Sequence, residues 1–294
     1  MVKNGVCAVV VTFRPQAEVF ENLTRLRPEV EAVVVVDNGS TEDELSLLRQ
    51  ASSILGFVLI ENRENLGLPA ALNIGMERAE TFGLQWFILF DQDSTVTDGF
   101  TEALLNSYLC HPKRERIGIV APRYVDARTR KPVSRHPPYL ADGCLETAMT
   151  SGSLLPSKIY REYGGFEEAL TIDMLDQEYS LRLRSHGLII VESENAVLLH
   201  APGFPKTYYF GRIRLFRALN HSPARQYYRV RNRVWIARRY GEQFPGLRLR
   251  SLGWQIRECL IILLSEKARG RKLWLTARGI KDGLLGHMGK TIEL

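Results

Sequence analysis

The sequence predicts an α/β protein with a mixed, mainly parallel sheet flanked by helices and with a helical, basic C-terminal region. Three observations lead to this prediction. Four runs rich in β-branched residues occur before residue 110, and each is followed by a polar or glycine-containing loop. A segment with helical character follows each loop. Apolar runs without alternation are typical of parallel strands that are buried on both faces of a sheet.

Strands and helices are expected to alternate through this N-terminal part. The predicted strands span residues 8–11, 32–36, 57–60 and 86–90. The predicted helices span residues 17–26, 41–51, 69–81 and 99–109. The second helix begins with Ser-Thr-Glu-Asp, which resembles an N-cap. The order indicates a series of βαβ units.

From residue 117 the alternation stops. A strand-like IGIVAP is followed by a turn-rich stretch over 126–138 and then by TSGSLLP. A helical segment over 167–187 and a strand over 188–200 come next. We interpret this part as the rest of a mixed sheet with inserted loops.

A change of composition after residue 200 predicts a domain boundary. Pro202, Gly203 and Pro205 are followed by a tail in which Arg and aromatic residues dominate. We therefore expect one domain over residues 1–205 and a helical, basic region over residues 206–294.

The composition is that of an ordinary globular protein. The 294 residues are 45% hydrophobic and 24% charged, with a mean hydropathy of -0.14. These values exclude a disordered chain, a fibrous protein and a small disulfide scaffold. Four cysteines without CxxC spacing predict free thiols in a reducing compartment, which we expect to be the cytoplasm.

No segment of the sequence predicts a membrane span. The N-terminal apolar run lacks the cleavage site of a secretory signal, and we interpret it as the first buried strand. The longest uninterrupted apolar stretch near the C-terminus covers residues 259–264, far below the ~20 residues that span a bilayer.

The charge is divided unevenly along the chain. The net charge is +6, but residues 201–294 contain 20 Lys and Arg against 5 Asp and Glu. Residues 1–200 contain 19 against 28. A basic tail of this kind predicts a polyanionic partner, which could be nucleic acid, anionic lipid or a phosphorylated substrate.

The loops after the predicted strands contain most of the candidate site residues. In open parallel sheets, ligands collect at the carboxyl ends of the strands. Here these ends read TFRP, DNGS, ENRENLG and DQDS. The first lacks the GxGxxG of a dinucleotide site, and the chain has no GxxxxGK[ST]. An ordinary NAD or FAD enzyme and a P-loop NTPase are therefore disfavoured.

Carboxylates at two strand ends have both a structural and a functional interpretation. Asp91 and Asp93 follow the strand WFILF, where they could hold a divalent cation or cap the next turn. Asp37 follows VVVV, where it could accept a hydrogen bond from a nucleobase or cap the next helix. Each motif taken alone leaves the choice open.

The order of the four motifs resembles the GT-A nucleotide-sugar domain of inverting family 2 glycosyltransferases. TFRP, VVDNGS, ENLGLPAALNIG and FDQDS agree with that family in order and spacing. GGFEEALTIDMLDQEYSLRLRSHG resembles its block with the catalytic base, and VLLHAPG resembles its late histidine motif. HSPARQYYRVRNRVW and GIKDGLLGHMG resemble the tail of the bacterial rhamnosyltransferase branch.

The resemblance implies roles for individual residues. Thr12 and Asp37 would hold the base and ribose of the donor, with Asp91 near the ribose and the metal. Asp93 and His200 would bind Mg2+ or Mn2+. The other implied donor-binding residues are Arg14, Asn65, Gly67 and Asn73.

Asp176 aligns with the catalytic base, but the motif departs from the common family pattern. Many members have Glu-Asp where this chain has Leu175-Asp176. Asp173 and Glu178 are therefore rival bases. On a helix, residues 173 and 176 share one face and Glu178 turns away, so Asp173 is the stronger rival. We also assign Asp173 to the substrate-binding residues.

Two tail segments have open interpretations. Tyr228, Arg231 and Asn232 could bind phosphate and sugar, because guanidinium groups match phosphate oxygens and rings stack on sugars. Alternatively Tyr228, Val234 and Trp235 are core residues of an amphipathic helix with solvated arginines. The segment 254–264 and the basic residues after it could lie on an anionic membrane or form a dimer or core helix.

Taken together, the resemblance predicts a metal-dependent inverting glycosyltransferase. The expected donor is dTDP-L-rhamnose, and the expected acceptor is a hydroxyl of a glycan or polyprenyl-linked bacterial cell-surface precursor at the inner face of the cell membrane. The basic tail would contact acceptor, membrane or a second copy in a homo-oligomer. One alternative keeps the fold and uses a UDP-sugar such as UDP-galactofuranose. Another is a nucleic-acid-binding protein, which leaves the strand-end motifs unexplained.

Overall fold

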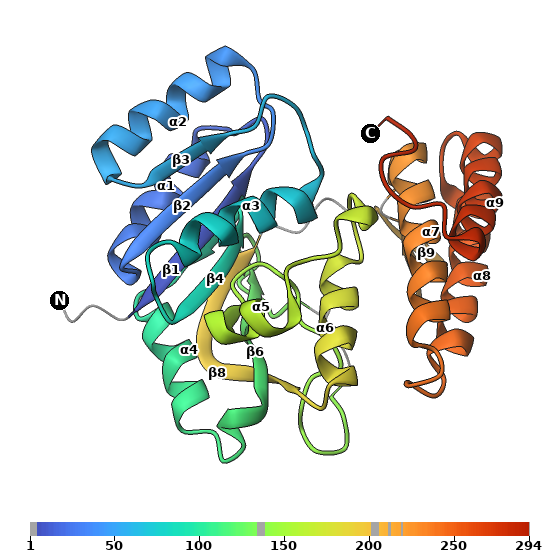
Figure 1. The fold of residues 1–294 in the computed structure, drawn as a ribbon. Helices are drawn as coiled ribbons and strands as arrows, with labels where there is room; N and C mark the ends of the chain where they lie inside the picture. The colour runs from blue at the N-terminus through green and yellow to red at the C-terminus, as the bar shows by residue number, and fades with distance from the viewer. Residues whose placement is uncertain (1–4, 134–138, 201–205, 211–212, 219, 294) are drawn as a thin grey trace. The chain divides into compact units, whose positions relative to one another are not determined.

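The computed structural model describes residues 5–133, 139–200, 206–210, 213–218 and 220–293 (Figure 1). The chain divides into two compact units. The first contains residues 1–167 and 179–201, and the second contains residues 168–178 and 202–294. Each unit is described below by itself.

The first unit is built on an eight-stranded mixed sheet with the order β3-β2-β1-β4-β7-β6-β8-β5. β3, β2, β1 and β4 are parallel, and β6 is parallel to β8. β7 is antiparallel to β4 and β6, and β5 is antiparallel to β8. The strands are β1 Val6–Thr12, β2 Ala32–Asp37, β3 Val58–Glu61, β4 Trp86–Asp91, β5 Ser94–Val96, β6 Ile117–Asp126, β7 Leu154–Pro156 and β8 Ile189–His200. The predicted mixed, mainly parallel sheet is confirmed.

Helices cover both faces of this sheet, which explains the uninterrupted apolar runs. Val6, Ala8 and Val10 of β1 belong to a core cluster that also contains residues of α1, α2 and α4. Val9 faces the other way, where a Cβ on Gly75 of α3 would lie 2.3 Å from its Cγ1. The helices are α1 Glu18–Leu26, α2 Glu42–Leu55, α3 Leu68–Glu80, α4 Phe100–Leu109 and α5 Ser157–Tyr163, with short 3-10 turns at Arg27–Glu29 and Arg114–Arg116.

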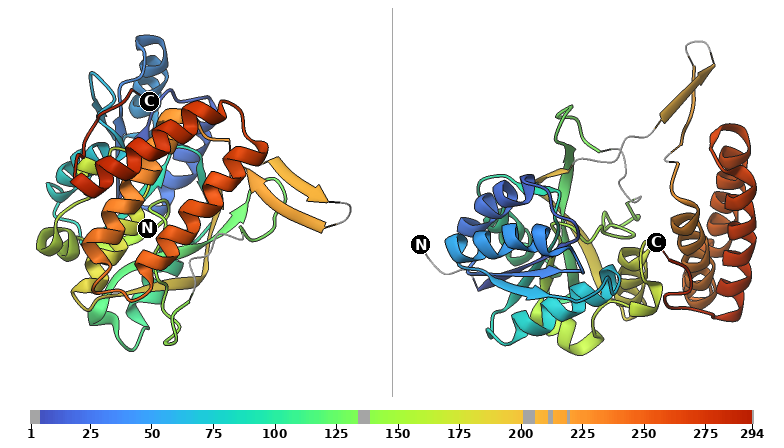
Figure 2. Two further views of the ribbon diagram at one scale, coloured as in Figure 1. Left: turned by 90° about the vertical axis from the view of Figure 1, so that its right-hand side faces the viewer. Right: turned by 90° about the horizontal axis from the view of Figure 1, so that it is seen from above.

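The second unit contains a hairpin and three long helices (Figure 2). β9 Lys206–Phe210 and β10 Ile213–Ala218 pair antiparallel. The helices are α7 Pro223–Tyr240, α8 Leu247–Ser265 and α9 Arg269–Leu285. Gly279 and Gly283 let α9 approach α7 closely, because a Cβ there would lie 2.8 Å from the Tyr227 carbonyl oxygen and 2.5 Å from that of Arg231.

The structure differs from the expected domain organisation in two respects. The region after residue 205 begins with a hairpin, whereas we expected helices. The segment 168–178, which we placed in the N-terminal domain, groups with the C-terminal unit. The predicted helix over 167–187 is also interrupted, since a 3-10 turn at Glu168–Leu170 is followed by a loop and then by α6 Leu175–Ser185. Pro202, Gly203 and Pro205 lie outside the described residues.

Within the part of the chain that the structure describes, none of the helices is both long enough and apolar enough to cross a membrane.

Candidate active site

The loop after β2 is organised around a buried carboxylate. Asp37 has no exposed surface. Its Oδ2 accepts hydrogen bonds from the Thr12 hydroxyl at 3.0 Å and the Ser40 hydroxyl at 2.6 Å. Its Oδ1 accepts from the backbone N–H groups of Gly39 and Ser40 at 3.2 and 2.8 Å. Thr12 and Asp37 lie together at the carboxyl ends of β1 and β2, where they hold the DNGS loop in shape.

Two asparagines join this loop to the one before α3. The Asn38 amide donates to Asn65 Oδ1 at 3.1 Å, and the same oxygen accepts from the Gly67 N–H at 2.9 Å. Asn38 Oδ1 accepts from the Leu66 N–H at 3.1 Å. The two loops are so close that a Cβ on Gly39 would lie 2.5 Å from the Glu64 carbonyl carbon. Asn65 and Gly67 therefore fix the shape of the loop that leads into α3.

Asn73 of α3 holds the GGF turn of the base block. Its amide donates to the Phe166 carbonyl at 2.9 Å, and its Oδ1 accepts from the Phe166 N–H at 2.7 Å. A Cβ on Gly165 would lie 2.2 Å from the same Oδ1. In this structure the side chain of Asn73 supports the turn by pairing with its backbone.

Gln92, which the sequence analysis missed, links the ends of β1 and β4. Its Oε1 accepts from the Phe13 N–H at 2.9 Å, and its Nε2 donates to the Phe13 carbonyl at 3.1 Å. Arg14 is next to Phe13, is exposed and has a φ of 50°. Its N–H donates to Ser40 Oγ at 2.8 Å. The position of Gln92 between two aspartates of a strand-end motif is the signal that could have identified it.

The DxD motif lies beside the predicted histidine because β5 pairs with β8. Ser94 lies opposite His200 in that antiparallel pair. The Nδ1 of His200 is 3.8 Å from Oδ1 of Asp93. Asp93 is half exposed, and Asp91 at the end of β4 is partly buried, with its N–H donating to Ser151 Oγ at 3.1 Å. The structure thus brings together Asp93 and His200, as the sequence predicted.

The two predicted metal ligands, Asp93 and His200, supply one carboxylate and one imidazole. In the described ranges, no three His, Cys, Asp or Glu side chains gather as a group that could hold a metal ion. A carboxylate and an imidazole leave most coordination positions of a divalent cation to other ligands. That incomplete set suits a cation shared with a bound phosphate group, because Mg2+ is commonly held by one or two carboxylates and substrate phosphates.

Asp176 lies in the second unit, at the second residue of α6. Its side chain is partly exposed, but loss of water around it and, to a smaller extent, the nearby charge of Asp173 raise its pKa to about 6. The Gln177 N–H donates a hydrogen bond to Asp176 Oδ1 at 2.8 Å, which lowers the pKa of Asp176. A carboxylate with this pKa is a stronger base than an ordinary aspartate and is still ionised at neutral pH.

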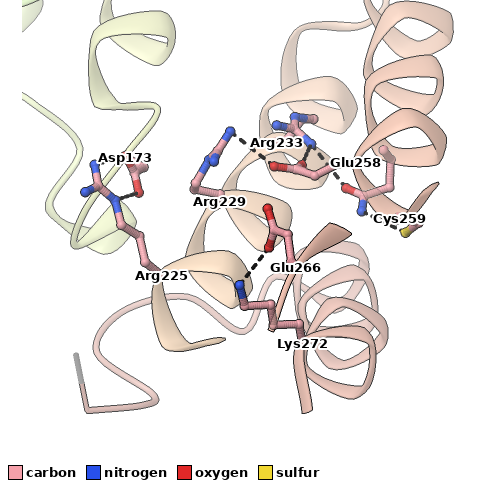
Figure 3. A network of polar contacts seen from close by, with 9 residues as sticks. Asp173, Arg225, Arg229, Arg233, Glu258, Cys259, Glu266 and Lys272 are labelled. Carbon is pink, nitrogen blue, oxygen red and sulfur yellow. Dashed lines mark hydrogen bonds and ion pairs between the residues drawn. The ribbon is translucent and has the colours of Figure 1, made fainter. Parts of the chain in front are cut away.

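Both rival bases have partners of their own. Asp173 accepts two hydrogen bonds from the Arg225 guanidinium, at 2.8 and 2.9 Å (Figure 3). Glu178 is buried and accepts from the Tyr240 hydroxyl at 2.6 Å. Burial and the Glu178 charge raise the pKa of Tyr240 well above its usual range, so Tyr240 stays a donor. Among the described residues of this segment, Asp176 is the carboxylate that accepts from a backbone N–H and not from an arginine or a tyrosine.

The backbone before Asp176 is strained. Thr171, Asp173 and Met174 have φ values of 66°, 60° and 66°, in the left-handed region that side chains other than glycine rarely adopt. Strain of this kind persists only where the surroundings enforce it. Here the surroundings are the side chains of α7.

Two buried side chains of α7 hold this strained segment. The Asn232 amide donates to the carbonyls of Leu170, Ile172 and Asp173 at 2.8–3.0 Å. Arg231 donates to the Ala169 and Leu170 carbonyls at 3.0 and 3.2 Å. Arg231 also lies over the rings of Tyr227 and Tyr228, with its guanidinium carbon 5.7 and 4.8 Å from the ring centroids.

These contacts correct the ligand-binding interpretation of the tail motif and confirm Tyr228 as a core residue. Tyr228, Arg231 and Asn232 have no exposed surface, so in this structure they stabilise the unit from within and do not present groups to a ligand. The alternative with solvated arginines is also wrong for Arg231, because its guanidinium bonds to the backbone. An arginine on a polar-looking helix gives no sequence signal for burial, since carbonyls from remote segments complete its hydrogen bonds.

A family model described as Glycosyl transferase family 2 matches residues 9–186. The chain is 26% identical to the dTDP-rhamnosyl transferase RfbF of Shigella flexneri over 97% of both chains.

Two solved structures resemble the fold. The mannosyltransferase PcManGT of Pyrobaculum calidifontis, in complex with GDP-Man and Mn2+, has a TM-score of 0.57 at 16% identity, covering 100% of this chain and 77% of that one. S. aureus TarS in complex with UDP has a TM-score of 0.53 at 15% identity, covering 95% and 72%. The chain spans 37% of a longer TarS structure. These likenesses confirm the expected GT-A architecture.

Proposed function

Because the chain belongs to glycosyl transferase family 2, we propose that it transfers L-rhamnose from dTDP-L-rhamnose to a hydroxyl of a lipid-linked bacterial cell-surface glycan. The observation that carries the choice of sugar is the identity of 26% to a dTDP-rhamnosyl transferase over 97% of both chains. Transfer at the cytoplasmic face of the cell membrane is part of the same proposal.

The donor nucleotide would lie at the carboxyl ends of β1, β2 and β4. Exposed Arg14 and half-exposed Asp93 are the groups with surface available for direct contact, and Asp91 is partly available. Thr12, Asp37, Asn65, Gly67 and Asn73 would act mainly through the loops that they hold. A preformed loop needs no ordering when the nucleotide binds, which favours affinity.

A divalent cation, Mg2+ or Mn2+, would be held by Asp93 and His200, with Asp91 nearby. When bound, it neutralises the charge that develops on the departing diphosphate. The pair His200 and Asp93 suits this role, since His200 Nδ1 lies 3.8 Å from Asp93 Oδ1 and the Asp93 side chain is half exposed. The Mn2+ in the PcManGT complex belongs to a protein of the same fold.

Asp176 would act as the general base. An acceptor hydroxyl attacks C1 of the sugar while the Asp176 carboxylate takes its proton, and the bond from C1 to the diphosphate oxygen breaks. One displacement inverts the configuration at C1. A pKa of about 6 keeps Asp176 ionised at pH 7 and basic enough to accept the proton.

Binding calorimetry tests the donor assignment. Wild-type protein is titrated with dTDP-L-rhamnose, dTDP-glucose, UDP-galactose and UDP-galactofuranose, each with and without Mg2+ or Mn2+. We expect metal-dependent binding with a preference for dTDP-L-rhamnose. Binding of a UDP-sugar in preference to both dTDP-sugars would contradict the proposed donor.

A second donor class is favoured by one specific observation. TarS, which shares the fold, binds UDP in its solved complex. The calorimetric panel distinguishes the two classes, and the Asp93→Ala variant provides the matched control for metal-dependent binding.

A further inference from the structure

Helix α8 exposes its apolar face. Six side chains on it are between 47% and 75% exposed and lie on adjoining turns, with no charged residue among them on the wheel of 3.6 residues per turn. They are Leu249, Leu252, Ile256, Leu260, Leu263 and Leu264. Contiguous exposed apolar surface of this kind marks a contact site.

The opposite face of α8 buries polar groups. Gln255 is 7% exposed, and its Oε1 accepts from Arg233 at 3.3 Å. Glu258 binds Arg229 at 3.2 Å and Arg233 at 2.8 Å across the contact with α7 (Figure 3). The polar network thus occupies the interior side of the helix, and the leucines are left on the outside. The exposed leucines of α8 are therefore not packed against the rest of the C-terminal unit.

The charges around this apolar face are positive. Residues 247–285 contain nine Lys and Arg against three Asp and Glu. Each of the three carboxylates is bound to a cation, Glu258 to Arg233, Glu266 to Lys272 and Asp282 to Arg278. Exposed cations therefore border the leucines without free carboxylates nearby. On α8 they are Arg248, Arg250 and Arg257, and Lys267, Arg269 and Arg271 are exposed further along the chain.

Two exposed tryptophans complete the pattern. Trp254 of α8 is 56% exposed and Trp274 of α9 is 62% exposed. Tryptophan is enriched at the boundary between the apolar interior of a bilayer and water. A helix with leucines on one side, arginines at their borders and an exposed tryptophan has the composition of an interfacial helix.

We propose that α8 docks on the surface of a bilayer that contains anionic phospholipid, with its leucines in the acyl boundary and its arginines on the lipid phosphates. The charges favour this occupant over a second copy of the chain. Two copies of this face would bring the same arginines together, and every carboxylate of the segment already has a partner. With Arg248, Arg250, Arg257 and Glu258 in its 19 residues, α8 is not apolar enough to cross the bilayer.

This inference deepens the proposed function, since a docked enzyme would meet a lipid-linked acceptor at the membrane surface. It nevertheless rests on α8 alone. Its test needs neither donor nor acceptor.

Vesicle flotation tests the docking surface. Wild-type protein is mixed with vesicles of phosphatidylethanolamine and phosphatidylglycerol, and in parallel with vesicles of phosphatidylcholine. We expect flotation with the anionic vesicles only. The double variant Ile256→Asp with Leu260→Asp should bind at least about tenfold more weakly, because it places charge in the acyl boundary.

The matched control changes two equally exposed apolar residues of the other unit. Leu47 and Ile54 of α2 are 50% and 62% exposed, so Leu47→Asp with Ile54→Asp should leave flotation unchanged. Arg250→Gln with Arg257→Gln should weaken binding by about fivefold per charge, and added salt should weaken wild-type binding in the same direction. Circular dichroism melting confirms that each variant is folded.

Three outcomes would overturn the inference. They are wild-type protein that does not float, a double variant in α8 that floats as well as wild type, and a wild-type dimer that this variant converts to a monomer in sedimentation. Calorimetry with dTDP-L-rhamnose on the same variants distinguishes a failure of membrane docking by α8 from a failure of the proposed rhamnosyl transfer. Lost flotation with intact donor binding supports α8 docking, and absent donor binding with intact flotation contradicts only the proposed function.

Discussion

The carboxylates of the segment 173–178 differ in their surroundings more than in their chemistry. Asp173 is neutralised by Arg225, and Glu178 accepts from Tyr240. Asp176 has a raised pKa and accepts a hydrogen bond from the backbone N–H of Gln177. Environment thus separates three residues that the sequence offered as rival bases.

Replacing Asp176 with asparagine should abolish transfer and leave donor binding nearly intact. The amide keeps the size of the side chain but cannot accept the proton. Donor binding is measured by calorimetry and transfer by product formation. Asp173→Asn serves as the control and should retain measurable transfer. A near-wild-type rate for Asp176→Asn would assign the role to Asp173.

The pH dependence of transfer follows from the pKa of Asp176. Because the base must be ionised, kcat/KM should fall as the pH drops through about 6. The charge of Asp173 raises this pKa, so Asp173→Asn should move the acidic limb to lower pH. An acidic limb at the same pH in both proteins would contradict the coupling.

The raised pKa of Asp176 also affects the stability of the fold. Transfer should fall at low pH, whereas the contribution of Asp176 to stability should fall at high pH. A carboxyl whose pKa is higher in the folded state stabilises the fold most when it is protonated, and this contribution is lost as the pH rises from about 4 through 6. At pH 8 the ionised Asp176 therefore opposes folding. Asp176→Asn should raise the Tm at pH 8 and change it less at pH 5, as measured by thermal melting.

At the scale of elements, the site depends on loops that touch each other. The DNGS loop after β2 and the loop before α3 meet at Gly39, which has a φ of 91°. The hydrogen bonds of Asn38 and Asn65 require this close approach. A side chain at position 39 would separate the two loops.

Gly39→Ala should therefore destabilise the protein by more than about 2 kcal/mol, from backbone strain together with the clash at Glu64. Gly56→Ala is the matched control, since Gly56 has a φ of 67° and open space around its Cβ position. The control should cost about 1–2 kcal/mol. Urea unfolding measures both free energies. If Gly39→Ala and Gly56→Ala lowered the free energy of unfolding equally, the two loops at Gly39 would have to move apart without cost.

The candidate site also depends on helix α7, because side chains of α7 hold the segment before Asp176, the proposed base. Asn232→Ala removes three hydrogen bonds to that segment and should lower kcat by about tenfold or more, with little effect on the affinity for donor. Arg238→Ala, an exposed position on the same helix, is the control. A change in donor affinity without a change in kcat would exclude a positioning role.

At the scale of the whole molecule, the described thiols are free in both units. Cys7 and Cys144 are buried, and Cys110 is exposed. Burial raises the pKa of Cys7 to about 12. In the native protein Cys110 should react first with Ellman's reagent, and Cys7 only after unfolding. Rapid reaction of Cys7 at neutral pH would mean that β1 opens readily.

The sequence predicted the sheet and its loops because parallel strands covered on both faces are apolar throughout. Val33–Val36 and the loop DNGS are an example, since burial and turn chemistry agree there. The hairpin β9–β10 escaped prediction because its strands are short and rich in Arg and Tyr. The left-handed Thr171, Asp173 and Met174 also escaped, because contacts with α7, remote in sequence, enforce them.

The same distinction between local patterns and contacts remote in sequence applies to the site residues. Asp93 and His200 came together as predicted, since strand register alone places them. Arg231 and Asn232 were assigned to substrate because their chemistry suits phosphate. Their burial depends on carbonyls of residues 169–173, and the sequence contains no local sign of those contacts.

The boundary between the two compact units passes through α6, between Glu178 and Tyr179. This position matters for domain exchange among related enzymes. A chimera joined near residue 201 would combine the 168–178 segment of one parent with the α7 of another. Arg231 and Asn232, which hold the carbonyls of that segment, would then come from a different parent than the segment itself. Recombination that transfers residues 168–178 together with the C-terminal unit would keep the proposed base and the side chains that support it in one inherited module.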